Sequence, residues 1–186
     1  MTELLIDIFG KPHGIIIFQL VAATRFTIYL SLVAFGGGGV VAAMITFLTI
    51  SPQPMLRKIA QTYIWFFQSI PLLMLLFLTG LGVPRLIGVD VNPWTAATIS
   101  LVLFTSAYLA EVWRGAIAAV LPGQWEAGFA LNISFVSTLK KVILPQAIRY
   151  GLAPTVGFMV QIIKGTSLAY IIGFSDLMLT GKRWAN

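Results

Sequence analysis

Residues 26–50 read FTIYLSLVAFGGGGVVAAMITFLTI, a run of about 25 residues without a charged side chain. A helix of this length crosses the roughly 30 Å of hydrocarbon in a bilayer. Four consecutive glycines, residues 36–39, would break a helix in water, but membrane helices use small residues for close packing. Residues 14–24 are also apolar, so the helix can begin before Arg25, and Pro52 and Pro54 end it. The run therefore predicts a transmembrane helix.

The composition of the whole chain agrees with this prediction. Of its 186 residues, 58% are hydrophobic and 10% are charged, whereas a soluble domain has about 25% charged residues. A chain this apolar cannot cover its surface with polar groups, so lipid must cover part of it. We expect an integral membrane protein.

Three further stretches have the length and polarity of membrane spans. They cover residues 59–81, 94–110 and 150–173, and residues 82–93 read as a loop. Pro71 should kink the second span, because it removes one backbone hydrogen bond. The sequence thus predicts an all-α, polytopic protein of about four transmembrane helices.

The charges indicate an orientation and exclude several function classes. Lys and Arg number 12 against 6 Asp and Glu, but they lie between apolar stretches and form no basic face for nucleic acid. Positive residues gather on the loops after the first and third spans, which places residues 115–149 in the cytoplasm and the N-terminus outside. The first ten residues lack the basic region of a cleavable signal, so the first hydrophobic helix should target the chain. With no cysteine and one histidine, a disulfide is excluded and a structural zinc site is implausible.

The most polar internal stretch, residues 115–149, carries the main functional hypothesis. Pro122-Gly123 supplies a turn, and Glu126 should lie in the first turn of the helix that follows, where the helix dipole favours a negative charge. Ala127, Gly128 and Ala130 are small, which suits insertion into a groove of a partner protein. The pattern alone favours the simpler alternative of an amphipathic surface helix.

At these residues the chain resembles the binding-protein-dependent permeases of ATP-binding-cassette importers. Their cytoplasmic pattern is Glu-Ala-Ala, three residues, Gly, nine residues, Ile, one residue, Leu-Pro. Glu126-Ala127 and Leu144-Pro145 match it with the right spacing. Gly128 replaces the second alanine, Asn132 stands at the glycine position and Val142 at the isoleucine position.

Further blocks are similar to the polar-amino-acid branch of that family. They extend the resemblance over residues 20–181 and comprise Ser106–Glu111, Arg114-Gly115, Pro122–Gln124, Pro145–Arg149 and Lys164–Leu168. The resemblance implies a transmembrane domain at 15–175 with a coupling loop at 119–149, an N-terminal segment at 1–14 and a short tail at 176–186. That branch typically has a fifth membrane helix after the Lys164–Leu168 block, so either the tail at 176–186 is truncated or the subunit works with fewer helices.

The resemblance also implies a mechanism and partners. A second permease subunit, identical or related, would complete the pathway for a polar amino acid, an external binding protein would deliver the substrate, and a separate ATPase subunit would receive the coupling helix. The residues implied for ATPase coupling are Glu126, Ala127, Gly128, Asn132, Leu144 and Pro145. Glu126 should pair with a basic group of the ATPase. Gly128 should loosen the helix by up to about 1 kcal/mol, and Asn132 should tolerate a left-handed backbone.

A second set of polar residues could contact the pathway: Lys164, Thr166, Ser167, Gln161, Glu111 and Gln68. Lys164 either faces the pathway, pairs with an acid such as Glu111, or snorkels to water. For Thr166 and Ser167, capping of a half-helix is favoured over lining the pathway. A structural ion pair with Arg114 is favoured for Glu111, and Gln68 and Gln161 remain open between pathway and packing roles.

The alternatives are a stand-alone channel or secondary transporter, or a truncated scaffold that does not transport. An intramembrane enzyme is the least favoured, because no paired nucleophile and base occurs. The chain has no Gly-x-x-x-x-Gly-Lys-Ser/Thr loop, so we expect it to bind neither ATP nor another cofactor. The expected location is the bacterial inner membrane, and the chain itself should not be an enzyme.

Overall fold

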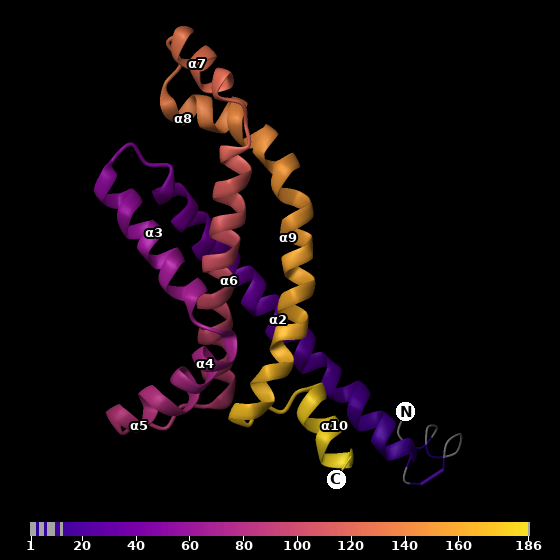
Figure 1. Cartoon of the computed structure of the whole chain (residues 1–186). Helices are drawn as coiled ribbons and strands as arrows, with labels where there is room; N and C mark the ends of the chain where they lie inside the picture. Colours follow the sequence, from indigo (N-terminus) through magenta and orange to yellow (C-terminus); the bar gives the residue numbers. More distant parts are fainter. Residues whose placement is uncertain (1–2, 4–5, 7–9, 12, 186) are drawn as a thin grey trace. The chain divides into compact units, whose positions relative to one another are not determined.

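The computed structural model describes residues 3, 6, 10–11 and 13–185. Every regular element in this part of the chain is helical (Figure 1), which confirms the predicted all-α class. The long helices are α2 (His13–Thr49), α3 (Pro54–Ser69), α6 (Pro93–Ala118) and α9 (Leu144–Thr166). The short elements are α4 (Leu72–Phe77), η1 (Leu78–Gly82), α5 (Val83–Ile87), α7 (Pro122–Ala130), α8 (Phe135–Thr138), η2 (Leu139–Ile143), η3 (Ser167–Ile172) and α10 (Leu177–Ala185). Most of the predicted N-terminal segment 1–14, and Asn186 of the tail, lie outside the described residues.

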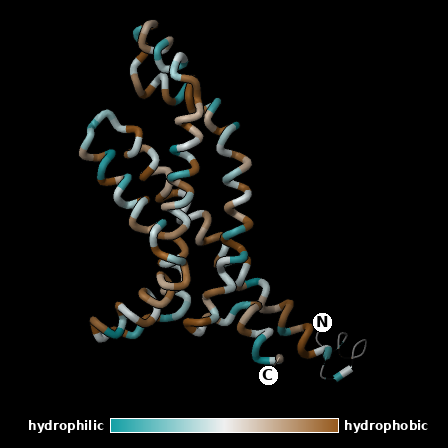
Figure 2. Tube along the Cα trace, viewed as in Figure 1, coloured by the Kyte–Doolittle hydropathy of each residue, from teal (hydrophilic) through white to brown (hydrophobic). Residues whose placement is uncertain are grey.

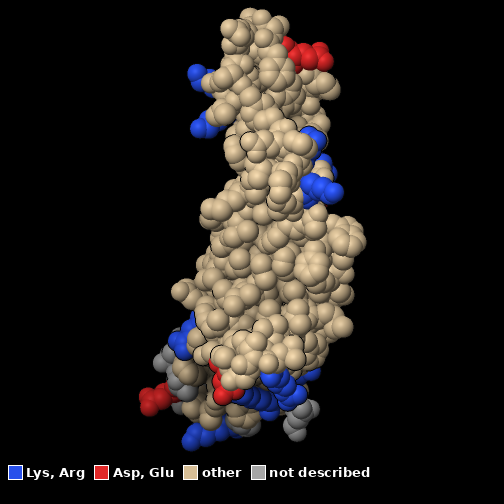
Figure 3. All heavy atoms as spheres, turned by 90° about the vertical axis from the view of Figure 1, so that its left-hand side faces the viewer, with Lys and Arg blue, Asp and Glu red and all other residues tan. Residues whose placement is uncertain are grey.

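Three stretches of helix are long and apolar enough to cross a membrane: His13–Thr49, Pro93–Ala118 and Phe135–Ile172. The pair formed by α3 and Leu72–Ile87 makes a fourth if its two halves count as one broken span. Figure 2 shows long hydrophobic stretches along these helices and hydrophilic residues in the connection between α2 and α3. On the face drawn in Figure 3, the charged side chains gather in groups, and a broad area between them carries none. The predicted number of about four spans is therefore confirmed.

Several predicted boundaries were wrong, because local patterns underestimate how far helices continue past polar residues. The predicted loop 82–93 begins later, since η1 and α5 carry the helix on to Ile87 and Gly88 ends it with a φ of +68°. The span predicted to end at Ala110 continues to Ala118. The span predicted to start at Tyr150 belongs to a helix that begins at Leu144.

The second span breaks where a kink was predicted. Helix α3 ends at Ser69, and Pro71 has an extended backbone with a ψ of 140° before α4 starts. Pro71 cannot donate a helical hydrogen bond and its ring clashes with the preceding turn, so the chain leaves the helix there. The proline thus separates two helices instead of bending one.

By their internal packing the helices form two compact units. The first unit comprises residues 1–36, 70–102 and 161–186, and the second comprises residues 37–69 and 103–160. In the first unit, the Thr79 and Ser100 hydroxyls lie 2.5 Å apart and join η1 to α6. Trp94 packs against Tyr29 and Phe174, at ring distances of 5.3 and 5.5 Å. Aromatic packing and a partly buried hydroxyl pair hold this unit together.

The second unit uses one of the predicted glycines for close packing. A methyl group on Gly38 would lie 2.6 Å from the Cβ of Thr105, so only glycine lets α2 approach α6 at this point. Gly36, in the same run, has no neighbour within 4 Å at its Cβ position. The indole of Trp113 donates a hydrogen bond of 3.0 Å to the Thr155 hydroxyl, which joins α6 to α9. The packing role of the glycine run is thus confirmed at one position.

Candidate functional site

Helix α7 occupies the end of the second unit, between the end of α6 and the start of α8 (Figure 1). Pro122 is its first residue, where a missing N–H costs nothing, and Leu121 provides no side-chain cap. Glu126 is the fifth residue, so the prediction that it lies in the first turn was wrong. The Pro-Gly pair is part of the helix and not a turn before it. The carboxylate is exposed and gains little from the helix dipole, whose effect is confined to the first turn.

The end of α7 is closed by the backbone of Asn132. This residue has a φ of 55°, the left-handed conformation that its position was predicted to tolerate. The N–H groups of Asn132 and Ile133 donate to the carbonyls of Phe129 and Gly128, at 2.9 and 3.0 Å. These two bonds form a Schellman motif, which satisfies two carbonyls at the helix end. The helix therefore has a defined end although glycine is absent from this position.

Gly128 faces inward and holds α7 against α8. A methyl group at Gly128 would lie 2.5 Å from Cγ2 of Thr138 and 2.7 Å from its hydroxyl oxygen. Alanine here would force the two helices apart, so the expectation that Gly128 merely loosens α7 was incomplete. Ala127 and Ala130 are exposed. The small residues thus point in different directions and do not form one small-residue face.

Leu144 and Pro145 lie where the chain turns from α8 into α9. The N–H of Leu144 donates to the carbonyl of Leu139, five residues earlier, which makes η2 a single wide turn. Pro145 explains the wide turn, because its ring would clash with the carbonyl of a regular helix four residues before it. The predicted Leu-Pro pair therefore sets the point where α9 begins.

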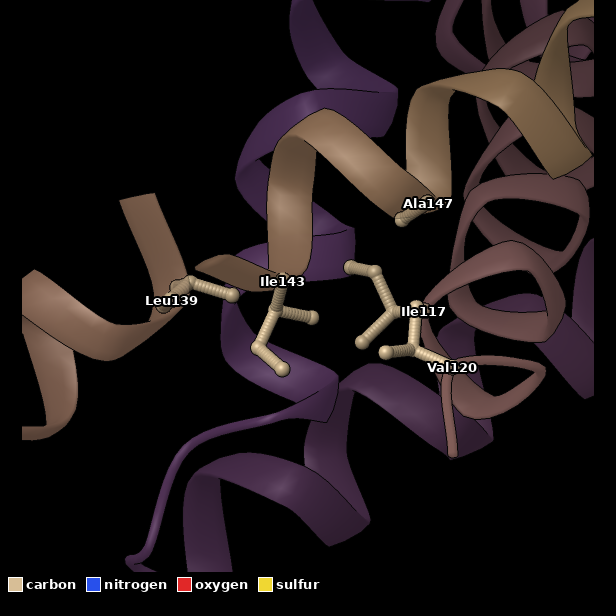
Figure 4. Close-up of a cluster of buried hydrophobic side chains, with 5 residues drawn as sticks. All are labelled: Ile117, Val120, Leu139, Ile143 and Ala147. Atoms are coloured by element: carbon tan, nitrogen blue, oxygen red, sulfur yellow. The ribbon is translucent and has the colours of Figure 1, made fainter. Parts of the chain in front are cut away.

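A hydrophobic cluster lies beneath these short helices. Figure 4 shows its five side chains, which converge from α6, the connection after α6, η2 and α9: Ile117, Val120, Leu139, Ile143 and Ala147. Trp125 of α7 and Phe135 of α8 pack against it, and their rings stack at 5.4 Å. Burying large apolar side chains stabilises such a cluster by roughly 1.5–3 kcal/mol each. The cluster makes α7, α8 and the start of α9 one packed body.

A polar contact also ties α7 to α9. The amide nitrogen of Gln146 lies 3.1 Å from the amide oxygen of Gln124 and 2.9 Å from the carbonyl of Val142. Ser134 starts α8 as an N-cap, since its hydroxyl accepts from the N–H of Ser137. Neither role was predicted from the sequence.

The outward surface of α7 and its ends is apolar around one carboxylate. Leu121, Phe129 and Leu131 are 71%, 57% and 73% exposed, and Glu126 lies among them in the chain. These apolar residues were not predicted as part of a contact surface, because a lone Phe or Leu in a helix is usually a core residue. The sequence did contain a signal for this surface, namely several large apolar residues in an otherwise polar loop. Such residues suggest a surface that binds a partner.

The pathway candidates of the second unit lie on α3 and α6. Arg114 donates to both carboxylate oxygens of Glu111, at 2.8 and 2.5 Å. This is the ion pair favoured from the sequence, and both side chains are partly exposed. The amide nitrogen of Gln68 lies 3.4 Å from the carbonyl of Ala107, which brings it to the same helix as Glu111.

The predicted pathway residues of the first unit lie at the end of α9 and the start of η3. The Thr166 hydroxyl donates to the carbonyl of Ile163 at 2.8 Å, and the Ser167 hydroxyl donates to that of Lys164 at 2.6 Å. The prediction that these two residues cap a half-helix was therefore wrong. The helix continues through them, and their hydroxyls donate to carbonyls three residues earlier. Thr166 is fully buried within the chain, whereas Lys164 and Gln161 are exposed.

The comparisons with known proteins define the class of protein. Residues 36–186 match the family of the binding-protein-dependent transport system inner membrane component. The chain belongs to this family and is a multi-pass membrane component of a transport system. Because the family consists of components of binding-protein-dependent transport systems, membership supports the transport-subunit hypothesis over a stand-alone channel.

Several individual proteins are similar to this chain. The chain is 37% identical over 157 residues to the probable amino-acid ABC transporter permease protein YckA of Bacillus subtilis, covering 84% of this chain and 69% of the relative. It is 34% identical over 152 residues to the L-cystine transport system permease protein TcyB of the same species, covering 82% and 64%. A crystal structure of an amino acid ABC transporter with histidines superposes with a TM-score of 0.82 and 29% identity, covering 88% of this chain and 76% of that one.

Proposed function

We propose that this chain is the membrane-spanning subunit of an ATP-driven importer for a polar amino acid, and that α7 is its coupling helix. The observation that carries the proposal is the outward surface of α7. It presents Phe129, Leu131 and the exposed carboxylate of Glu126 on a helix that is packed from behind. The family supports a transport role, and the names of YckA and TcyB support an amino acid as the substrate.

The packing behind α7 suits the transmission of movement. A coupling element must move as one body with the helix that it drives, because a soft connection would absorb the displacement. Gly128 contacts Thr138, and the Gln124–Gln146 bond joins α7 to α9. Leu144 and Pro145 then carry a displacement of α7 directly into α9, which switches between outward-open and inward-open arrangements.

The proposal includes partners and a location. A separate ATPase subunit binds α7, with Glu126 near one of its basic groups. A second permease subunit completes the pathway, and an external binding protein delivers the amino acid at the far side of the bacterial inner membrane. ATP hydrolysis takes place on the ATPase, so this chain contributes the pathway and the coupling, and no catalysis.

The test is co-purification of the complex from membranes with its ATPase, comparing Phe129→Ala with Tyr150→Ala. Tyr150 is a matched control, an aromatic residue of α9 with 55% exposure against 57% for Phe129. Removing a central aromatic anchor costs at least about 2 kcal/mol of binding, or more than tenfold in affinity. We expect Phe129→Ala to release the ATPase and Tyr150→Ala to retain it.

Equal retention by the two variants would contradict the coupling role of α7. A further variant, Glu126→Gln, should weaken binding less and only at low salt, because an exposed ion pair contributes no more than about 1 kcal/mol. A loss of binding in Glu126→Gln that persists at high salt would argue against a simple ion pair.

A further inference from the structure

The second unit contains an apolar hollow between α2, α6 and α9. Its volume is about 420 Å³, within the range of roughly 300–1,000 Å³ that is typical of ligand pockets. Ala116, Ala147 and Gly151 are buried and form its floor, whereas Phe47 and Leu152 on its rim are 54% and 61% exposed. The hollow therefore exists because small residues lie between larger ones, and it opens to the surface of the chain.

The polar side chains in the walls of the hollow are already hydrogen-bonded to one another or to the backbone. Apart from Thr46, Thr155 and the indole nitrogen of Trp113, every residue that lines the hollow is apolar. The Thr46 hydroxyl donates to the carbonyl of Ala110 at 3.3 Å, and the Trp113 indole donates to the Thr155 hydroxyl at 3.0 Å. A polar ligand would lose its hydration and gain few hydrogen bonds here, so the hollow fits an apolar occupant.

The hollow has the depth of one leaflet of a bilayer. One end is lined by residues at the helix ends, since Ile50 follows α2, Ile117 lies near the end of α6 and Leu139 begins η2. Between Leu144 and Thr155, which also line it, α9 rises by about 16 Å. This rise is close to half of the roughly 30 Å of hydrocarbon in a bilayer. Because the chain belongs to a family of membrane components, lipid acyl chains of this length lie beside its exposed helices.

Three basic side chains lie at the end of the hollow where the helices end. Lys140 and Lys141 follow the lining residue Leu139 directly, and Arg149 lies in the second turn of α9. All three are exposed, and none has an ion-pair partner in the described part of the chain. Side chains of a helix tilt toward its N-terminus, so Arg149 reaches back from α9 toward the two lysines. Residues 135–160 contain no Asp or Glu that would neutralise them.

A group of cations beside an apolar hollow suits the two parts of an anionic phospholipid. Lysine and arginine donate strong hydrogen bonds to a phosphate, and basic pockets between transmembrane helices bind anionic head groups. We propose that the second unit binds one anionic phospholipid, with an acyl chain in the hollow and the phosphate among Lys140, Lys141 and Arg149. A transmembrane helix of a partner would cover the hollow but leave the three cations unpaired.

The bound lipid contacts α2, α6 and α9 at once, because all three helices line the hollow. It therefore braces the end of α9 that is joined to α7 and α8. The inference needs only the membrane location of the chain, so it is independent of the coupling role proposed for α7.

The test is photo-crosslinking in nanodiscs that contain the chain and the subunits that co-purify with it. The discs hold a trace of phosphatidylglycerol with a diazirine in its acyl chain or, in parallel, phosphatidylcholine with the same acyl chain. Mass spectrometry quantifies the adducts on Phe47 and Leu152, which line the hollow. The control positions are Met44 and Val156, which lie on the same two helices at similar exposure but do not line it.

We expect phosphatidylglycerol to label Phe47 and Leu152 at least about tenfold more than phosphatidylcholine does, because each basic residue at an anionic surface contributes roughly fivefold to binding. Met44 and Val156 should show no such preference. Equal labelling of the hollow by the two lipids would overturn the anionic head group. Labelling of the control positions without any adduct in the hollow would show that a protein segment covers it, and would overturn the lipid as its occupant.

Two pairs of adjacent basic residues separate the head-group site from a general attraction to positive charge. The double variant Lys140→Gln, Lys141→Gln removes two cations beside the hollow. The control is Arg57→Gln, Lys58→Gln, which removes an equally exposed pair at the start of α3 that does not line the hollow. We expect the first double variant to lose most of the preference for phosphatidylglycerol and the second to keep it. Equal loss in both would assign the preference to net charge and overturn the site.

A last pair of variants tests the place of the acyl chain. Ala43→Phe fills the hollow, whereas Ala153→Phe adds the same ring to an alanine of α9 outside it. Both alanines are exposed, so neither substitution disturbs the core. We expect Ala43→Phe to abolish the adducts on Leu152 and Ala153→Phe to leave them unchanged. Equal labelling of Leu152 in the two variants would show that the acyl chain does not lie in the hollow.

Discussion

The two short helices α7 and α10 have the same length and are held in opposite ways. Each has nine residues, too few for a stable isolated helix. Helix α7 has no side-chain cap and depends on packing of Gly128 and Trp125. Helix α10 is held by polar contacts: the carboxylate of Asp176 accepts from the N–H of Leu179 at 2.8 Å, and Trp184 donates to Gln19.

The two kinds of attachment suit the two helices to different tasks. A helix that packs tightly on its neighbours moves with them, which suits the transmission of force proposed for α7. A helix held by single hydrogen bonds can detach at a lower cost, since each such bond contributes only about 0.5–1.5 kcal/mol. We therefore expect α7 to be most sensitive to a change in side-chain volume, and α10 to the loss of its capping hydrogen bond.

The largest effect is expected from Gly128→Ala. The added methyl group overlaps Thr138 at 2.5 Å, and overpacking of this kind costs about 1–3 kcal/mol. We expect a lower thermal midpoint in detergent and weaker retention of the ATPase. Gly123→Ala is the matched control, because Gly123 lies in the same helix and has no neighbour within 4 Å at its Cβ position.

The double variant Gly128→Ala, Thr138→Ala sharpens this test. Thr138→Ala removes the two nearest of the three atoms that the new methyl group meets, and the buried Thr138 hydroxyl has no hydrogen-bond partner in the described part of the chain. The double variant should recover most of the lost stability. If Gly128→Ala proved no worse than Gly123→Ala, packing would not be what holds α7.

A smaller effect is expected from Asp176→Ala, which removes the cap of α10 and costs about 1 kcal/mol. Asp176→Asn keeps an acceptor oxygen and should preserve the helix. Trypsin cleavage after Lys182 or Arg183 reports the detachment of α10, so we expect faster cleavage in the alanine variant and unchanged cleavage in the asparagine variant. Equal cleavage of both variants would contradict the capping role.

The same residue should make stability depend on pH. Burial raises the pKa of Asp176 above its ordinary value of 3.8, against the lowering effect of its backbone hydrogen bonds. The folded chain then holds the proton more tightly than the unfolded chain, so stability falls as pH rises from 3.8 through the raised pKa. Asp176→Asn should abolish this fall in the thermal midpoint. A fall of the same size in the variant would assign it to another group.

The smallest effect is expected from Asn132→Gly. Glycine adopts the left-handed backbone without a Cβ penalty but increases the entropy of the unfolded chain, so the two terms oppose each other. We expect a change below about 0.5 kcal/mol in either direction and full retention of the ATPase. A marked loss of the ATPase with unchanged stability would show that the Asn132 side chain itself contacts the partner.

Much of the fold could be predicted because lipid imposes a simple rule on composition. The run at 26–50 and the break at Pro71 follow from apolar length and from the missing N–H of proline. Helix ends could not be predicted as well, since Ala110 and Gly82 lie inside helices that neighbouring segments stabilise. The packing role of Gly128 was not predicted, because the low helix propensity of glycine describes only α7 itself. The contact that requires glycine is made with Thr138 of α8.

The sequence by itself determined the membrane class, the family and the position of the segment 122–145, because these depend on composition and on spacing along the chain. Only the tertiary structure decided which sides of that segment face inward. Thr138 takes the space beside Gly128, Trp125 and Phe135 cover the cluster, and Phe129 and Leu131 are left exposed. The physical reason is that a side chain stays exposed only where no other part of the chain packs against it. Contacts between residues far apart in the sequence determine where that is.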